Sequence, residues 1–287
     1  MFAITGVTGN VGGEVARSLL GAKRPVRAVV RDARKGAEWA GFGCEVSIAD
    51  IGDVAALAAA FEGAEGVFAL VPPSFDPQPG FPEAQRTAET LKAAIEMAHP
   101  ERVVYLSTIG AQVTRTNLLS QHTMIEGVLR EMAIPITFLR PGWFMENASW
   151  DVGAAKEGLV RSFLEPLDKP VPMVSTMDIG RVAAGLIQET WSGARVVELE
   201  GPRRVTPNEL GAAFAKVLGH GVRMVEVPRE TWEALFRSQG MKNPEPRVQM
   251  LDGFNEGWIE FENRGTVLKG RVELETAVKA LVERAER

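Results

Sequence analysis

A glycine-rich turn at the start of the chain limits its fold more than any other feature. An apolar run at residues 2–5 is followed by Gly6, Gly9 and Gly12, with the spacing G-x-x-G-x-x-G, and then by a helical pattern. Between a strand and a helix, the first glycine permits a tight turn, the second lets backbone approach a pyrophosphate, and the third lets helix and sheet pack closely. The N–H groups and partial positive charge of the helix N-terminus attract the same anion. The segment predicts a dinucleotide-binding loop, whose other predicted contacts are Thr8, Asn10 and Val11.

Short apolar runs alternate with helical patterns as far as about residue 140, as in repeated β-α-β units. The predicted strands are residues 2–5, 26–31, 45–48, 66–71, 102–107 and 136–140. Several are continuous apolar runs, as expected for parallel strands covered on both faces. The pattern predicts an α/β fold, namely a Rossmann-type doubly wound parallel sheet with a smaller α+β cap domain.

The length of 287 residues exceeds that of a typical single core, so a large domain and a smaller one are expected. We expect residues 1–142 to form an NAD(P)-binding Rossmann domain, which residues from about 178–200 rejoin. Residues 143–177 and 201–287 are expected to form the small substrate or cap domain.

Several elements are predicted within the second half. Asp178 is expected to cap a helix that runs through Glu189. A strand at residues 195–199 is expected to return to the main sheet, and another strand is predicted at residues 223–227. The last helix has one apolar face, formed by Leu274, Val278, Leu281 and Ala285.

Composition argues against several classes of function. Cys44 is the only cysteine, which rules out an intrachain disulfide and a cysteine-based metal site, and the three histidines show no metal-ligand spacing. We therefore expect no metal. A net charge of -5 with scattered basic residues gives no reason to expect nucleic-acid binding. The N-terminus lacks a signal-peptide pattern, and no stretch approaches the roughly 20 apolar residues of a membrane span. We expect a cytoplasmic protein with no membrane partner, either a monomer or a homodimer.

The residues after the second predicted strand bear on the choice of cofactor. An acidic residue at this place is typical of NAD enzymes, whereas an arginine suits the 2′-phosphate of NADP. Arg31 stands at the strand tip, and Lys35 lies one turn into the next helix. A guanidinium offers phosphate two parallel donors, and an ammonium adds a point charge. We expect NADP(H) in preference to NAD(H), although Asp32 keeps NAD(H) as an alternative and a solvated helix start would also explain Lys35.

Two further loops are expected at the adenine end of the cofactor, one at the adenine amino group and the other beside the adenine ribose. Asp50 follows the third strand and can accept a hydrogen bond from the adenine amino group; the alternative is that it caps the helix that begins near Asp53. Leu70, Val71 and Pro72 end the fourth strand, because proline cannot continue a central strand. Leu70, Val71 and Pro72 are predicted to contact the cofactor, as is Asp50.

Several motifs together carry a resemblance to a known family. These motifs are residues 5–12, 30–32, 106–110, 138–147, 174–180 and 270–272. The chain resembles the NmrA-like branch of the atypical short-chain dehydrogenase/reductases, which includes NADP-sensing regulators, quinone oxidoreductases and triphenylmethane reductases. The resemblance implies that the three glycines line the pyrophosphate and that Arg31 meets the 2′-phosphate. It also implies contacts with the nicotinamide or the substrate entrance for Thr108, Pro141, Trp143 and Asn147.

The catalytic pair of the wider superfamily is missing from the sequence. Its members use Tyr-x-x-x-Lys, in which the lysine lowers the pKa of the tyrosine. Tyr105 is the only tyrosine, and Ile109 stands four residues after it. No lysine occurs between Lys92 and Lys156. Tyr105 is therefore expected to be a structural residue of the fifth strand.

His122 is the predicted proton donor. His122 and Glu126 are four residues apart and share a helix face, similar to a His-x-x-x-Glu of the quinone-reductase-like members. A histidine that titrates near neutrality can act as a general acid. The alternative is a polar helix start packed against cofactor or solvent. Thr108 and Asn147 are the other candidate catalytic contacts, although such residues are more often structural.

The missing strong acid favours soft acceptors. In a quinone or another conjugated electrophile the developing charge spreads over the π-system, so that a weak donor or solvent suffices. The aromatic residues expected to line an apolar cleft are Phe75, Trp143, Phe144, Trp150, Phe254 and Trp258. The leading hypothesis is an NAD(P)H-dependent reductase of a quinone-like, aromatic or otherwise conjugated small molecule. The alternatives are a non-catalytic NADP(H)-binding redox sensor or regulator of the NmrA type, and an isomerase or tailoring enzyme.

Overall fold

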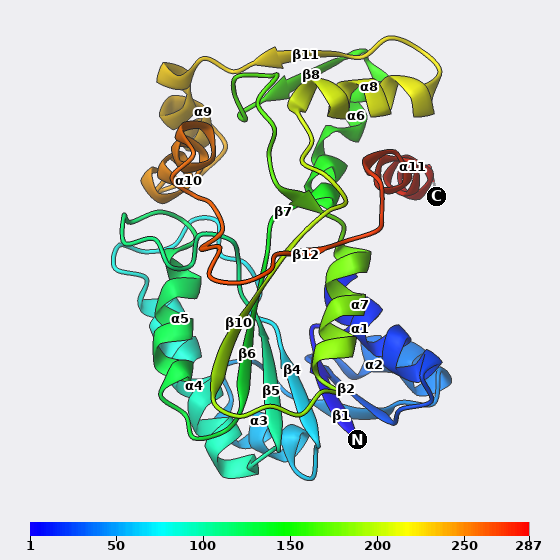
Figure 1. The fold of residues 1–287 in the computed structure, drawn as a ribbon, viewed down its shortest axis with the longest axis vertical. Helices are drawn as coiled ribbons and strands as arrows, with labels where there is room; N and C mark the ends of the chain where they lie inside the picture. Colours follow the sequence, from blue (N-terminus) through cyan, green and yellow to red (C-terminus); the bar gives the residue numbers. More distant parts are fainter. Residues whose placement is uncertain (287) are drawn as a thin grey trace.

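The computed structural model describes residues 1–286, and an eight-stranded parallel sheet lies at its centre (Figure 1). Its strand order is β12-β10-β6-β5-β4-β1-β2-β3. The strands are β1 (Phe2–Thr5), β2 (Val26–Val30), β3 (Glu45–Ile48), β4 (Gly66–Ala69), β5 (Arg102–Leu106), β6 (Ile136–Pro141), β10 (Ala194–Glu200) and β12 (Leu268–Lys269). The chain moves outward from β1 to β3 on one side and from β4 to β6 on the other. The order therefore reverses between β1 and β4, and the predicted doubly wound parallel sheet is confirmed.

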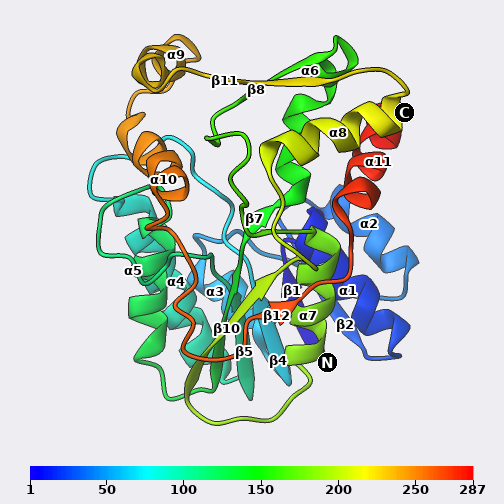
Figure 2. The ribbon, with the colours of Figure 1, turned by 45° about the horizontal axis from the view of Figure 1, so that its top comes forward.

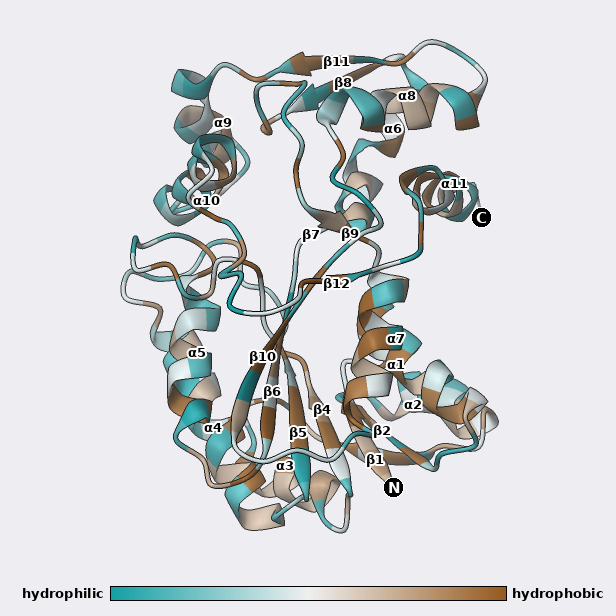
Figure 3. Ribbon diagram, viewed as in Figure 1, coloured by the Kyte–Doolittle hydropathy of each residue, from teal (hydrophilic) through white to brown (hydrophobic). Residues whose placement is uncertain are grey.

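Helices cover both faces of this sheet (Figure 1). One face carries α1 (Asn10–Gly21), α2 (Ala33–Gly41) and α7 (Thr176–Leu186), and the other carries α3 (Val54–Phe61), α4 (Pro82–Ala98) and α5 (Ser120–Arg130). Successive strand residues point to opposite faces, so Phe2 and Ile4 pack with the first layer and Ala3 with the second. Figure 3 shows the resulting concentration of apolar residues in the central strands.

A second group of elements, here called the cap, lies beyond the carboxyl ends of the main strands (Figures 1 and 2). Its largest buried side chains, Trp232, Phe236 and Phe214, belong to a separate apolar core. Two-stranded sheets join β8 to β11 within the cap and β7 to β9 where the chain leaves the main sheet. The elements are β7 (Trp143–Phe144), η1 (Met145–Asp151), α6 (Val152–Lys156), β8 (Leu159–Ser162), β9 (Met173–Val174), α8 (Pro207–Leu218), β11 (Arg223–Glu226), η2 (Arg229–Thr231), α9 (Trp232–Ser238), α10 (Glu245–Glu256) and α11 (Leu274–Ala285).

The chain returns to the main sheet twice after entering the cap, since β10 pairs with β6 and β12 pairs with β10. The expected role of Asp178 as an N-cap is wrong. Ser175 caps α7, with its hydroxyl accepting from the backbone N–H of Met177, and the helix ends at Leu186 rather than at residue 189. The buried carboxylate of Asp178 instead accepts from the N–H groups of Arg271 and Val272, each at 2.8 Å, and so fixes the segment that returns from β12.

The exact boundaries of the two expected domains stay a prediction. The apolar face expected on α11 is buried at Leu274, Val278 and Leu281, whereas Ala285 at the end of the helix is exposed. No helix within residues 1–286 is both long enough and apolar enough to cross a membrane.

Candidate functional site

The glycine loop holds backbone against backbone where β1 meets α1. Gly6 has φ +66°, and its carbonyl accepts from the N–H of Gly9 at 3.0 Å. A Cβ on Gly12 would lie 2.3 Å from the Gly6 carbonyl oxygen and 2.8 Å from that of Thr5, so only glycine fits this position. No side chain caps α1, whose N-cap residue is Gly9. The first turn of α1 therefore offers N–H groups and a partial positive charge to an anion.

A cavity of about 900 Å³ lies where the loops after β1, β4, β5 and β6 meet the cap. This is the edge at which open parallel sheets bind ligands, beside the reversal of strand order. Nine predicted site residues line the cavity: Asn10, Val11, Leu70, Val71, Pro72, Thr108, His122, Trp143 and Asn147.

Five of the six aromatic side chains expected at the cleft line this cavity. The ring of Trp143 meets that of Phe254 edge to face at 5.1 Å between centroids, and Phe75 meets Trp150 in the same way at 5.8 Å. Phe144 also lines the cavity. Trp258 does not, because its ring instead lies under the guanidinium of Arg115.

The other predicted cofactor residues lie outside the cavity wall. They are Gly6, Thr8, Gly9, Gly12, Arg31, Lys35, Asp50 and Pro141. Pro141 is buried as the last residue of β6, and its carbonyl accepts from the N–H of Ile109 at 2.8 Å. The next residue, Gly142, reaches the cavity.

Of the charged residues after β2, Asp32 and Arg34 are paired, whereas Arg31 and Lys35 have no partner within residues 1–286. The carboxylate of Asp32 accepts from the backbone N–H of Arg34 at 2.9 Å and from its guanidinium at 3.1 Å, and so caps α2. These hydrogen bonds from Arg34 lower the pKa of Asp32. Arg31 and Lys35 are exposed, and within residues 1–286 neither side chain has a hydrogen bond or an ion pair. The available charge at this strand end is therefore cationic.

Asp50 does not cap a helix, so that alternative is wrong. Its carboxylate accepts from the N–H of Gly52 at 2.9 Å, which forms a turn before α3. Asp53 caps α3 instead and accepts from the N–H of Ala56 at 3.0 Å. The contact between Asp50 and adenine stays a prediction.

His122 contacts Tyr105, which the sequence predicts to be a structural residue. Tyr105 is fully buried in β5, and its hydroxyl lies 2.8 Å from Nδ1 of His122. Burial holds the pKa of Tyr105 well above its usual range, so the phenol keeps its proton. In the tautomer in which the phenol donates to Nδ1, the histidine carries its own proton on Nε2.

The charge state of His122 differs from the expectation. The predicted role as a proton donor requires an imidazole that titrates near neutrality. Burial lowers the pKa of His122 to about 4, so the ring is neutral at pH 7. A neutral ring can donate a hydrogen bond from Nε2 but supplies no imidazolium proton. His122 can stabilise negative charge beside it without acting as a strong acid.

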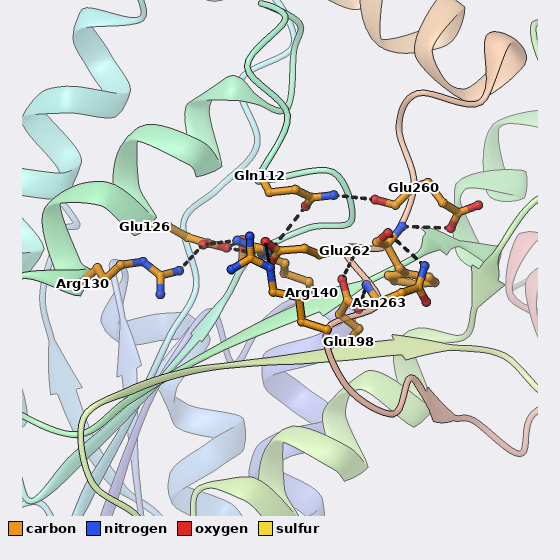
Figure 4. A network of polar contacts seen from close by, with 11 residues as sticks. Gln112, Glu126, Arg130, Arg140, Glu198, Glu260, Glu262 and Asn263 are labelled. Carbon is orange, nitrogen blue, oxygen red and sulfur yellow. Dashed lines mark hydrogen bonds and ion pairs between the residues drawn. The ribbon is translucent and has the colours of Figure 1, made fainter.

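Glu126 shares a helix face with His122 but is engaged elsewhere (Figure 4). Its buried carboxylate accepts from Arg140 at 2.8 and 2.6 Å and from Arg130 at 3.1 Å. Arg140 also donates to Glu262 at 3.0 Å and to Gln112 at 3.2 Å. These contacts fasten α5 to β6 and to the segment that returns from the cap. Glu126 therefore positions the helix that carries His122.

Two charged residues of the cavity had no signal in the sequence. Asp151 ends η1, and Arg247 lies in the first turn of α10; both line the cavity. Neither belongs to a motif, because only the closure of the cap over the sheet brings them to this place. Burial raises the pKa of Asp151 to about 6.

Asp151→Asn is expected to stabilise the fold at neutral pH. The folded-state pKa of about 6 exceeds the reference value of 3.8, so ionisation of Asp151 opposes folding as the pH rises through this window. The asparagine variant should match the parent near pH 4 and gain about 2 kcal/mol above pH 6. Denaturant unfolding across this range measures the difference. Asp168→Asn, at an exposed carboxylate, is the control and should show no such dependence; equal pH dependence in both variants would contradict the assignment.

The chain is similar to known proteins along most of its length. Residues 1–267 match the sequence profile of the NmrA-like family. The chain is 32% identical to the (4-alkanoyl-5-oxo-2,5-dihydrofuran-3-yl)methyl phosphate reductase of Streptomyces griseus over 79% of this chain and 77% of that protein. It is 30% identical to quinone oxidoreductase 2 of Escherichia coli over 88% and 85% of the two chains. The crystal structure of an Escherichia coli NADPH-dependent quinone oxidoreductase complexed with NADPH superposes with a TM-score of 0.81, at 26% identity, over 98% of this chain and 99% of that one.

Proposed function

The chain belongs to the NmrA-like family, and from this premise we propose that it is an NADPH-dependent reductase of a quinone-like or other conjugated small molecule. The observation that carries the proposal is the aromatic-walled cavity of about 900 Å³ beside the glycine loop. Relatives along most of the chain are named as reductases, one of a quinone and one of a dihydrofuran phosphate ester. These relatives favour a reductase over a non-catalytic regulator.

The residues at the sheet edge fit a bound NADPH. The Gly12 position has no room for a side chain, and the uncapped start of α1 presents its N–H groups to a pyrophosphate. Arg31 is exposed and free of partners within residues 1–286, which suits a 2′-phosphate, while the carboxylate of Asp32 already accepts from Arg34. When bound, NADPH supplies the reducing equivalent.

Three side chains of the cavity are proposed to contact the reacting part of the acceptor. They are the imidazole of His122, the amide of Asn147 and the hydroxyl of Thr108. All three are neutral donors, which suffice where negative charge spreads over a conjugated system. An isolated ketone concentrates that charge on one oxygen and needs a stronger acid. We therefore propose turnover without a Tyr-x-x-x-Lys pair and with a preference for conjugated acceptors.

The test of this function is steady-state oxidation of NADPH with a panel of quinones, conjugated furanones and isolated ketones. We expect turnover of the conjugated acceptors and little or none of the isolated ketones. Tight NADPH binding without oxidation by any conjugated acceptor would reject the reductase and favour a regulator.

The proposed role of Arg31 predicts the effect of Arg31→Asp on cofactor preference. NADPH should bind the parent more tightly than NADH, and the variant should lose that difference. A charge-assisted contact of roughly 1.5–3 kcal/mol corresponds to about tenfold to a hundredfold in affinity. Calorimetric titration of both cofactors measures it, and Lys279→Gln, at an exposed residue of α11, serves as the control. Equal dissociation constants for NADPH and NADH in the parent would remove the assignment.

A further inference from the structure

Arg247 is an unpaired cation in the wall of an otherwise largely apolar cavity. Its guanidinium carbon lies 4.3 Å from the ring centroid of Phe236, a fully buried residue of α9. The side chain is partly buried, and within residues 1–286 it makes no hydrogen bond and no ion pair. By contrast, Arg229, on the preceding η2, donates two hydrogen bonds to Asp252. Arg247 therefore differs from this neighbouring arginine in having no carboxylate partner.

This arrangement is costly for the protein alone. A partly buried guanidinium without an acceptor loses part of its hydration, and stacking on an aromatic ring recovers some of that loss. Burial lowers the pKa of Arg247, and no neighbouring carboxylate opposes that effect. An anion that enters the cavity would supply the missing acceptor and would bind in a poorly hydrated place, where charge-assisted hydrogen bonds are strong.

Three other charged groups line the cavity, and none of them forms an ion pair with Arg247. They are Glu83, Asp151 and Arg161. Arg161, an exposed residue of β8, has no ion pair among residues 1–286. Asp151 and Arg247 are not joined by a hydrogen bond or an ion pair within residues 1–286. Arg247 therefore has no carboxylate partner among the residues that line the cavity.

We infer that Arg247 binds an anionic substituent of the acceptor, a carboxylate, sulfonate or phosphate carried on the conjugated ring. This inference rests on the proposed function in that the acceptor occupies the same cavity. The planar fork of arginine suits all three oxyanions, because each offers two oxygens side by side. The aromatic wall at Trp143 and Phe254 would hold the ring, and Arg247 would then select acceptors that bear a negative group.

The experiment compares an unsubstituted naphthoquinone with its ring sulfonate. The measured quantity is the ratio of kcat/KM for the sulfonate to that for the neutral quinone, and intrinsic reactivity cancels when this ratio is compared between protein variants. Arg247→Gln is expected to lower the ratio about tenfold or more, and Arg247→Lys should lower it less, because it keeps the charge without the planar fork. Arg237→Gln removes an arginine of α9 that pairs with Glu233 on the surface, and it should leave the ratio unchanged. An unchanged ratio in Arg247→Gln would overturn the inference.

A second measurement does not depend on turnover. Naphthalenesulfonate and a neutral naphthalenemethanol are titrated into the parent and Arg247→Gln in the presence of NADP⁺, with inorganic sulfate as a separate competitor. We expect the sulfonate to bind the parent at least tenfold more tightly than the variant, and the neutral compound to bind both alike. If no quinone is reduced but this difference appears, the proposed reductase function is rejected and the binding of an anionic group by Arg247 is supported. If sulfate alone competes as well as naphthalenesulfonate, Arg247 binds free anions and the inference about the acceptor is wrong.

Discussion

Gly12→Ala is expected to reduce NADPH affinity about a hundredfold or more and to destabilise the fold. The added Cβ would lie 2.3 Å from the carbonyl oxygen of Gly6 and 2.8 Å from that of Thr5. Both neighbours are backbone atoms, so no side chain can rotate away and α1 must move from β1. Overpacking of this kind costs about 1–3 kcal/mol in stability. The same movement displaces the loop and the helix N-terminus that we propose hold the pyrophosphate, and a loss of ~3 kcal/mol is about a hundredfold in affinity.

The control lies at the other end of the same helix. A Cβ on Gly21 would meet nothing within 4 Å, and alanine is the better helix former. Gly21→Ala should keep NADPH affinity and gain up to about 1 kcal/mol in unfolding free energy. Calorimetric titration and denaturant unfolding of both variants make the comparison. Retention of parental NADPH affinity by Gly12→Ala would contradict the proposed position of the cofactor.

The main sheet and its glycine loop could be predicted because their signals are local. Continuous apolar runs specify strands that are covered on both faces, and three glycines at fixed spacing specify a close helix–strand approach. The strand ends were less well predicted. Arg31, Val71 and Ser107 follow β2, β4 and β5 rather than belonging to them. At β4, the hydroxyl of Thr5 accepts from the N–H of Leu70 at 2.7 Å, so a side chain of β1 replaces a ladder partner there.

The parts of the site that could not be predicted depend on contacts between distant segments. Aspartate is a common N-cap residue, but the carboxylate of Asp178 accepts a hydrogen bond from the backbone N–H of Val272 instead of capping α7. Tyr105 and His122 lie 17 residues apart, and only the packing of α5 on β5 brings the hydroxyl to the imidazole. Asp151 and Arg247 come from separate elements of the cap. Sequence spacing identifies partners on one helix or strand. The partners described here come from distant segments and meet only when the helices pack on the sheet and the cap packs on both.

The His-x-x-x-Glu spacing predicted the helix correctly but did not predict the partner of its glutamate. The pattern correctly placed His122 and Glu126 on one helix, and the structure assigns Glu126 to a buried ion pair with Arg140 (Figure 4). Breaking such a pair leaves an uncompensated buried charge. The glutamate therefore anchors the helix, and the role proposed for the histidine rests on its neutral ring and on the hydrogen bond with Tyr105.

His122→Ala is expected to lower kcat with a good conjugated acceptor about a hundredfold while NADPH affinity changes little. Loss of one preorganised donor to a developing oxyanion typically costs 10²–10³-fold. His220→Ala, at an exposed histidine of the cap, is the control and should retain parental turnover. Tyr105→Phe removes the hydroxyl that contacts Nδ1 but leaves the imidazole in place. The kcat of this variant should therefore stay within a few-fold of that of the parent.

The pH profile tests the charge state behind this prediction. Because the pKa of His122 is about 4, its ring stays neutral from pH 6 to pH 8, and the ratio of parental kcat to that of His122→Ala should be constant there. An imidazolium acid of ordinary pKa, near 6.5, would instead make the ratio fall as the pH rises through that value. Such a fall would show that His122 supplies a proton and that the buried, neutral ring is the wrong description. Equal turnover by parent and variant at every pH would remove His122 from the reaction and leave Asn147 and Thr108 as the donors to test.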